Sequence, residues 1–69
     1  MQIELKVESH PSGRWTLKHR DHRDENFSDY PAGSPLFGNE NPAKFYRAVA
    51  REIADLNKQG HEVQYEDVL

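Results

Sequence analysis

Hydrophobic and polar residues alternate at the start of the chain. Ile3, Leu5 and Val7 are separated by charged residues, and this period of two is typical of a strand with one buried side and one solvent-facing side. The pattern predicts a strand over residues 2–9. Proline and glycine in the following residues 10–13 favour a tight hairpin turn closed by a bulge.

A second strand is predicted over residues 14–20, where hydrophobic residues alternate again. A slip of one residue would turn the hydrophobic side chains of this strand toward solvent, so the pattern restricts the register of the hairpin. The register that keeps them buried sets Val7 opposite Leu17 on the inner face and Glu4 opposite Arg20 on the outer face.

The chain changes to a helical period near residue 42. Asn41 is suited to the N-cap, and Gly60 to the left-handed residue that ends a helix, so a helix is predicted over residues 42–59. A short third strand follows over residues 62–66. On the helix, one stripe is hydrophobic and contains Phe45, Val49, Ile53 and Leu56, and the opposite stripe is basic and contains Lys44, Arg47, Arg51 and Lys58, here called the basic face.

The order strand, strand, helix, strand predicts a small two-layer α+β domain of ββαβ order, with the antiparallel hairpin and the third strand in one sheet and the helix packed across it. The third strand fits beside the first strand, in either direction. The expected core consists of Ile3, Leu5, Val7, Trp15, Leu17, Phe45, Val49, Ile53, Leu56, Val63 and Tyr65.

Residues 21–40 show no periodicity and are rich in proline, glycine and short polar residues, which predicts a long loop. The loop also contains four large hydrophobic residues, so we expect it to be ordered and to pack on the domain. Such side chains either supplement a small core or anchor a protein partner. The candidates for partner binding in this loop are Phe27, Tyr30, Leu36 and Phe37.

With 69 residues, the chain is expected to be one domain, residues 1–69, with a small core that a partner or a homodimer would help to stabilise. Because it contains no cysteine, neither a disulfide nor a thiolate zinc site is available, which favours a reducing, cytoplasmic setting. No export signal or membrane segment is recognisable, and we expect a complete soluble gene product.

The segment around the end of the second strand contains His19 and His22 with Asp21, Asp24 and Glu25, which are residue types that can bind zinc. Residues three apart on a strand face opposite sides, however, so a solvated strand end of mixed charge is the favoured interpretation. We predict no metal site, no cofactor and no catalytic residue, and therefore a protein that is not an enzyme.

The basic face could meet phosphate groups or an acidic protein surface. A nucleic-acid-binding regulator would use it together with Arg14, Lys18 and Arg20. The formal net charge of −3 argues against a general nucleic-acid binder, because such proteins usually carry a basic excess.

A small cysteine-free α+β chain with a long aromatic loop resembles, in size and organisation only, the accessory or inhibitor proteins of phages and mobile elements, anti-CRISPR proteins among them. The resemblance implies a protein-binding module that acts by occluding a larger protein or complex. The alternatives are the nucleic-acid-binding regulator and, third, a metal-assisted enzyme.

Overall fold

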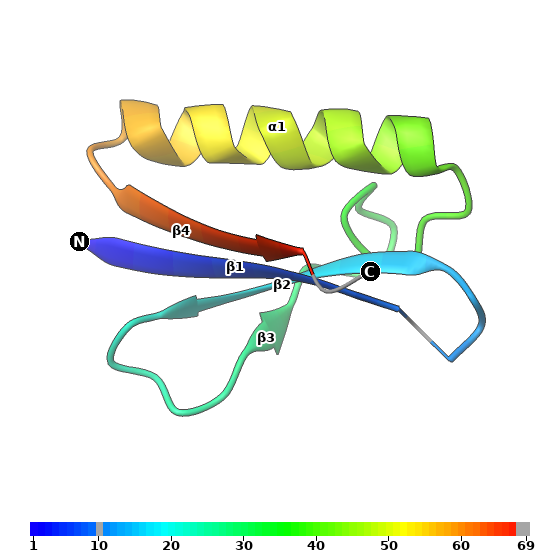
Figure 1. Cartoon of the computed structure of the whole chain (residues 1–69), viewed down its shortest axis with the longest axis horizontal. Helices are drawn as coiled ribbons and strands as arrows, with labels where there is room; N and C mark the ends of the chain where they lie inside the picture. The colour runs from blue at the N-terminus through cyan, green and yellow to red at the C-terminus, as the bar shows by residue number, and fades with distance from the viewer. Residues whose placement is uncertain (10, 68–69) are drawn as a thin grey trace.

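One helix lies across a four-stranded sheet in the computed structural model, which describes residues 1–9 and 11–67 (Figure 1). The sheet has the strand order β3-β2-β1-β4. The α+β class and the order of the predicted strands and helix are confirmed. The elements are β1 (Gln2–Ser9), β2 (Trp15–Asp21), β3 (Ser28–Asp29), α1 (Pro42–Lys58) and β4 (Glu62–Asp67).

Strands β1 and β2 form the predicted antiparallel hairpin in the predicted register. Val7 lies opposite Leu17, and Glu4 lies opposite Arg20. The first pair faces α1, and both of its side chains have no exposed surface. Hydrophobic alternation therefore restricted the register, because a slip of one residue would turn one member of this pair toward solvent.

The hairpin turn contains Gly13 with a φ of +83°, a left-handed conformation that glycine adopts without steric cost. His10, which the sequence places in this turn, lies outside the described residues. Strand β2 runs from Trp15 to Asp21, so it begins and ends one residue later than the predicted range of 14–20.

Strand β4 lies beside β1 and runs parallel to it, with Ile3 paired to Val63. The backbone N–H of Glu62 donates to the carbonyl of Met1 at 2.9 Å and starts this pairing. Helix α1 supplies the return of the chain that a parallel pair requires. The sequence left the direction of this strand open, and the structure also extends it by one residue, to Asp67.

The core lies between α1 and the inner face of the sheet. Trp15 is only half-buried, and Tyr65, expected in the core, is 42% exposed. The expectation for Tyr65 was wrong because β4 is an edge strand, so its side chain is covered on one side only. Leu36 takes part in the core although it was not assigned there. The buried hydrophobic residues are Leu5, Val7, Leu17, Leu36, Phe45 and Val49.

Residues 21–40, predicted as a loop, run along the edge of β2 that faces away from β1 and pair with it at separate points. The short strand β3 lies beside β2, and the N–H of Leu17 donates to the carbonyl of Leu36 at 2.8 Å. Trp15 and Asn39 exchange two backbone hydrogen bonds of 2.9 and 2.8 Å. This segment therefore holds Leu36 over the sheet, next to α1.

Helix α1 begins and ends as its capping residues predict. The side chain of Asn41 accepts a hydrogen bond from the N–H of Lys44 at 3.1 Å. Gln59 is the C-cap, so the helix ends one residue before the predicted boundary, and Gly60 follows with a φ of +90°.

Candidate functional site

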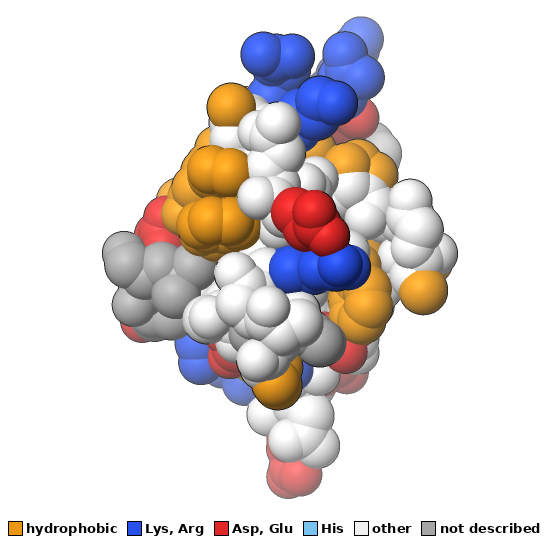
Figure 2. Space-filling view, turned by 90° about the vertical axis from the view of Figure 1, so that its right-hand side faces the viewer, with side chains coloured by type: hydrophobic (Ala, Val, Ile, Leu, Met, Phe, Trp, Pro, Cys, Tyr) orange, Lys and Arg blue, Asp and Glu red, His pale blue; other side chains and the backbone are white. Residues whose placement is uncertain are grey.

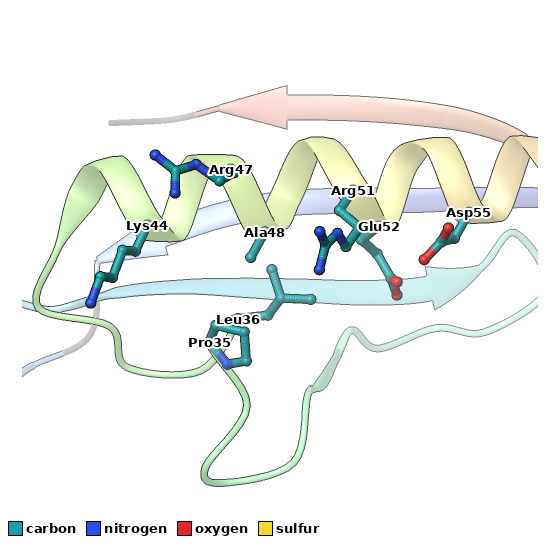
Figure 3. Close-up of a pocket in the computed structure, with 8 residues that line it drawn as sticks. All are labelled: Pro35, Leu36, Lys44, Arg47, Ala48, Arg51, Glu52 and Asp55. Atoms are coloured by element: carbon teal, nitrogen blue, oxygen red, sulfur yellow. The ribbon is translucent and has the colours of Figure 1, made fainter.

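A groove runs between the outer side of α1 and the segment that contains Pro35 and Leu36, with a volume of about 440 Å³. Figure 3 shows Leu36 beside Ala48, with the longer side chains of α1 on either side of this pair. We call this feature the helix groove. Its lining residues are Pro35, Leu36, Lys44, Arg47, Ala48, Arg51, Glu52 and Asp55.

The helical repeat explains why these side chains line one groove. Lys44, Ala48, Arg51 and Asp55 are separated by three or four residues, which places them along one side of the helix. Phe45, one position beyond Lys44, points to the core instead and has no exposed surface. The small side chain at position 48 leaves the space that forms the floor of the groove.

The charges of the helix groove differ between its two ends. Lys44 and Arg47 lie toward the start of α1, and Glu52 and Asp55 lie toward its end, as Figure 3 shows. At a rise of about 1.5 Å per residue, the centres of these two pairs are roughly 12 Å apart along the axis. Arg51 lies between the two pairs, beside the uncharged floor at Ala48 and Leu36. The groove therefore has a basic end, an uncharged floor and an acidic end.

The basic residues fall into two classes by their ion pairs. In the described part of the chain, every Lys and Arg outside α1 has an acidic partner. Glu8, for example, lies 3.2 Å from Lys6 Nζ and 3.5 Å from Lys18 Nζ, and the pKa of its carboxyl is lowered by its hydrogen bond with Lys6. The other paired residues are Arg14 with Glu40, Arg20 with Glu4, and Arg23 with Asp21.

The basic face has no such partners among the described residues. Across residues 1–9 and 11–67, the structure records no ion pair for its four side chains, although α1 itself contains Glu52 and Asp55. Figure 2 shows Lys and Arg side chains gathered at the top of the molecule, over the helix. Lys58 lies in the last turn of α1 and does not line the helix groove. The other three members of the basic face do.

Tyr30 connects the loop to β2 and α1 through its ring and its hydroxyl. Its ring lies against the ring of His19, with centroids 4.6 Å apart, and its hydroxyl donates to Oε2 of Glu52 at 2.7 Å. Burial and this hydrogen bond raise the pKa of Tyr30. Leu36 is 7% exposed and belongs to the core, and it also lines the helix groove.

Phe27 and Phe37, the other two aromatic candidates of the loop, lie apart from Tyr30. Phe27 is on the outer face of the sheet, where the guanidinium of Arg20 is 4.4 Å and Nζ of Lys6 is 5.5 Å from the ring centroid. Phe37 is half-buried and borders a shallow hollow beside Gly33. The structure therefore does not join the four loop candidates into one surface.

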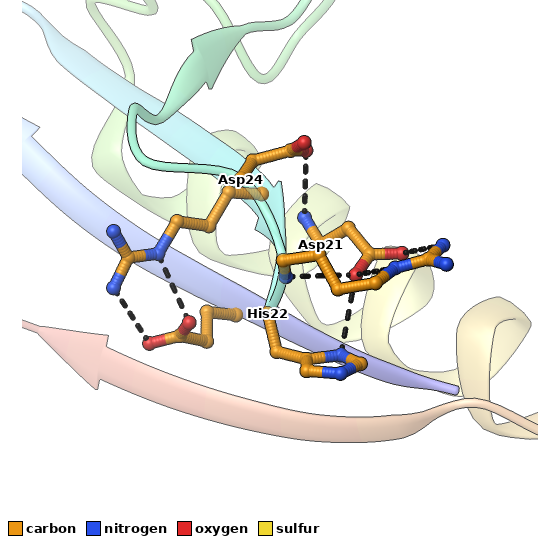
Figure 4. Close-up of polar contacts among 6 residues, drawn as sticks. Asp21, His22 and Asp24 are labelled. Atoms are coloured by element: carbon orange, nitrogen blue, oxygen red, sulfur yellow. Dashed lines mark hydrogen bonds and ion pairs between the residues drawn. The ribbon is translucent and has the colours of Figure 1, made fainter.

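The residues considered for metal binding are arranged as a turn at the end of β2 (Figure 4). His22 Nδ1 lies 3.2 Å from Oδ1 of Asp21, and Oδ2 of Asp24 accepts a hydrogen bond of 3.3 Å from the backbone N–H of Asp21. Hydrogen bonds from Arg23 lower the pKa of Asp21. His19 instead contacts Tyr30, and the described residues contain no group of three or more His, Asp or Glu side chains arranged to hold a metal ion.

Sequence reasoning found the charged residues of the site but missed its floor. The signal for Ala48 was present, since it lies four residues from Lys44 and three from Arg51. The contribution of Pro35 depends on how the loop crosses the sheet, and no local pattern indicated that path.

Comparisons with protein-family models, with curated proteins and with solved structures gave no match. Within the described residues, no helix has the length and apolar character needed to cross a membrane.

Proposed function

We propose that this protein is a non-enzymatic binding module of the cytoplasm that attaches to a larger protein through the helix groove and occludes the surface it covers. One observation carries the proposal: the cations of the groove lack acidic partners within the described residues, whereas the cations outside α1 have them. An acidic segment of a partner would provide the missing counter-charges.

The uncharged floor and the acidic end favour a protein segment over a nucleic acid. A nucleic acid presents a regular series of phosphates, and Glu52 and Asp55 would repel those that reached their end of the groove. A peptide can instead place acidic residues against Lys44 and Arg47 and a small hydrophobic side chain against Ala48. The nucleic-acid-binding regulator remains the alternative outcome of the test below.

The proposal is tested by affinity capture of partners from extract of the native host, followed by titration of the purified partner. Arg51→Glu reverses one charge in the groove, and Lys58→Glu reverses one on the same helix outside the groove. Because neither side chain has an ion pair in the described structure, both variants are expected to fold like the wild type. We expect Arg51→Glu to weaken binding at least about tenfold and Lys58→Glu to change it little.

Three results would contradict the proposal. Equal loss of affinity in both helix variants would mean that net charge, and not the groove, drives binding. Capture of DNA or RNA whose affinity falls steeply with salt would support the nucleic-acid-binding regulator. Loss of binding in Phe37→Ser, with Arg51→Glu unaffected, would move the contact surface from the groove to the loop.

A further inference from the structure

The two edges of the sheet differ in whether another segment of the described chain pairs with them. At the β2 edge, β3 and the backbone of Leu36 and Asn39 occupy positions beside the strand. At the opposite edge, no segment of the described chain pairs with the outer side of β4 (Figure 1). An uncovered edge strand presents backbone groups that can accept another strand.

The outward-facing backbone groups of β4 include those of Val63 and Tyr65. The N–H of Glu62 points inward, because it donates to the carbonyl of Met1. Alternate residues of a strand direct their backbone groups to opposite sides, so those of Val63 and Tyr65 point away from β1. They repeat at about 6.6 Å, the spacing that the backbone of an added strand would match.

The side chains along β4 restrict what such a strand can be. Glu62 and Glu66 are exposed on the outer face of the sheet, and no ion pair is recorded for either within residues 1–9 and 11–67. Val63 and Tyr65 lie on the helix side, where Tyr65 is 42% exposed. The edge thus has two glutamates separated by Gln64 on one face, and Val63 and Tyr65 followed by Asp67 on the other.

We infer that β4 binds an extended segment of a partner protein as a fifth strand, with basic residues beside Glu62 and Glu66 and apolar residues beside Val63 and Tyr65. Opposite charges on neighbouring strands stabilise a sheet, and like charges destabilise it. A second copy of β4 would bring further glutamates to the same row, so the charges disfavour self-pairing and favour a basic strand. This surface is separate from the helix groove and does not depend on the function proposed for it.

The probe is a short synthetic peptide in which lysine and valine alternate, with an alternating glutamate and valine peptide as its control. Amide hydrogen exchange, followed residue by residue by NMR, reports the new backbone bonds. With the lysine peptide, the amides of Val63 and Tyr65 are expected to exchange about tenfold more slowly, the effect of roughly one hydrogen bond each. The amide of Gln64, already directed at β1, should change little.

Two variants separate backbone pairing from charge attraction. Tyr65→Pro removes an outward N–H and leaves the inward ladder intact, because proline is accepted where a strand edge faces solvent. It should abolish the slowing at position 63 by the lysine peptide. Glu62→Lys with Glu66→Lys keeps the backbone and should transfer the preference to the glutamate peptide.

Three outcomes would overturn the inference: no slowing with the lysine peptide, equal slowing with both peptides, or an unchanged preference in the lysine double variant. Slowing that depends on protein concentration in the absence of peptide, with a dimer in sedimentation, would also overturn it, because the occupant would then be a second copy. If Tyr65→Pro does not fold, the double variant Glu62→Lys with Glu66→Lys still tests the inference.

Discussion

The hydroxyl of Tyr30 donates a hydrogen bond of 2.7 Å to Oε2 of Glu52 and joins the long connection to the middle of α1. Glu52 also lines the acidic end of the helix groove. The same bond therefore positions a charged group of the candidate site and holds the loop against the helix. It links two parts of the chain that sequence patterns treat as independent.

Removal of this hydroxyl should loosen the loop. Tyr30→Phe keeps the ring against His19 and deletes only the hydrogen bond, so we expect a loss of about 1.5 kcal/mol in the free energy of unfolding, typical of a bond to a charged acceptor. Urea denaturation followed by tryptophan fluorescence measures the change, because Trp15 pairs with the same connection at Asn39.

Tyr46→Phe is the matched control for this prediction. The hydroxyl of Tyr46 donates to Asp67 at 2.9 Å, but this pair is exposed and the acceptor lies near the end of β4. The control should lose less stability than Tyr30→Phe. Equal losses would show that the Tyr30 bond does not hold the loop more firmly than a surface contact does.

Local sequence patterns were sufficient to predict the elements in which hydrophobic residues recur at a regular spacing. Alternation in β1 and β2 predicted both strands and restricted their register, because a slip of one residue would expose Val7 or Leu17. The helical stripe and the caps determined α1 to within one residue. In each case the information lies within about 20 consecutive residues, where sequence periodicity acts.

Other features depend on residues that are distant in sequence. The parallel direction of β4, the exposure of Tyr65 and the burial of Leu36 follow from where each segment lies in the sheet, and alternation cannot distinguish an edge from a centre. For the candidate site, the stripe of cations was predictable from helical spacing. The groove was not, because its second wall is formed by the path of the loop at Pro35.

A core substitution in α1 should unfold the protein. Phe45 has no exposed surface, and Phe45→Ala should cost about 3–5 kcal/mol, close to the whole stability of a small domain. Trp15 is half-buried at the start of β2, so Trp15→Ala should cost less, about 2–3 kcal/mol. Thermal melts by circular dichroism separate the two, and a greater loss for Trp15→Ala would contradict this view of the core.

At the position after the C-cap of α1, a change to asparagine should reduce stability less than a change to alanine. Gly60 has a φ of +90°, and an added Cβ would meet no atom within 4 Å, so the backbone conformation alone sets the cost. Gly60→Ala is expected to lose about 1–2 kcal/mol, and Gly60→Asn clearly less, because asparagine enters this conformation more readily. Chemical denaturation of both variants checks the order, and equal stability of Gly60→Ala and the wild type would contradict it.

Alkaline pH should destabilise the protein through its tyrosines. Burial and the charge of Asp67 raise the pKa of Tyr65 from 10.0 to about 12, and burial and hydrogen bonds to carboxylates raise the pKa values of Tyr30 and Tyr46. The unfolded chain then releases these protons at lower pH than the folded protein does. The contribution of Tyr65 to stability is complete below pH 10 and decreases as the pH rises from 10 to about 12.

The double variant Tyr46→Phe with Tyr65→Phe isolates this effect from the deprotonation of lysines, which wild type and variant share. Urea midpoints measured from pH 8 upward should fall more steeply above pH 10 for the wild type than for the variant, because the variant cannot form tyrosinate at either position. A parallel decline of the two proteins would mean that Tyr46 and Tyr65 ionise equally in the folded and unfolded states. The carboxylate of Asp67, which accepts hydrogen bonds from both hydroxyls, would then not hold them protonated.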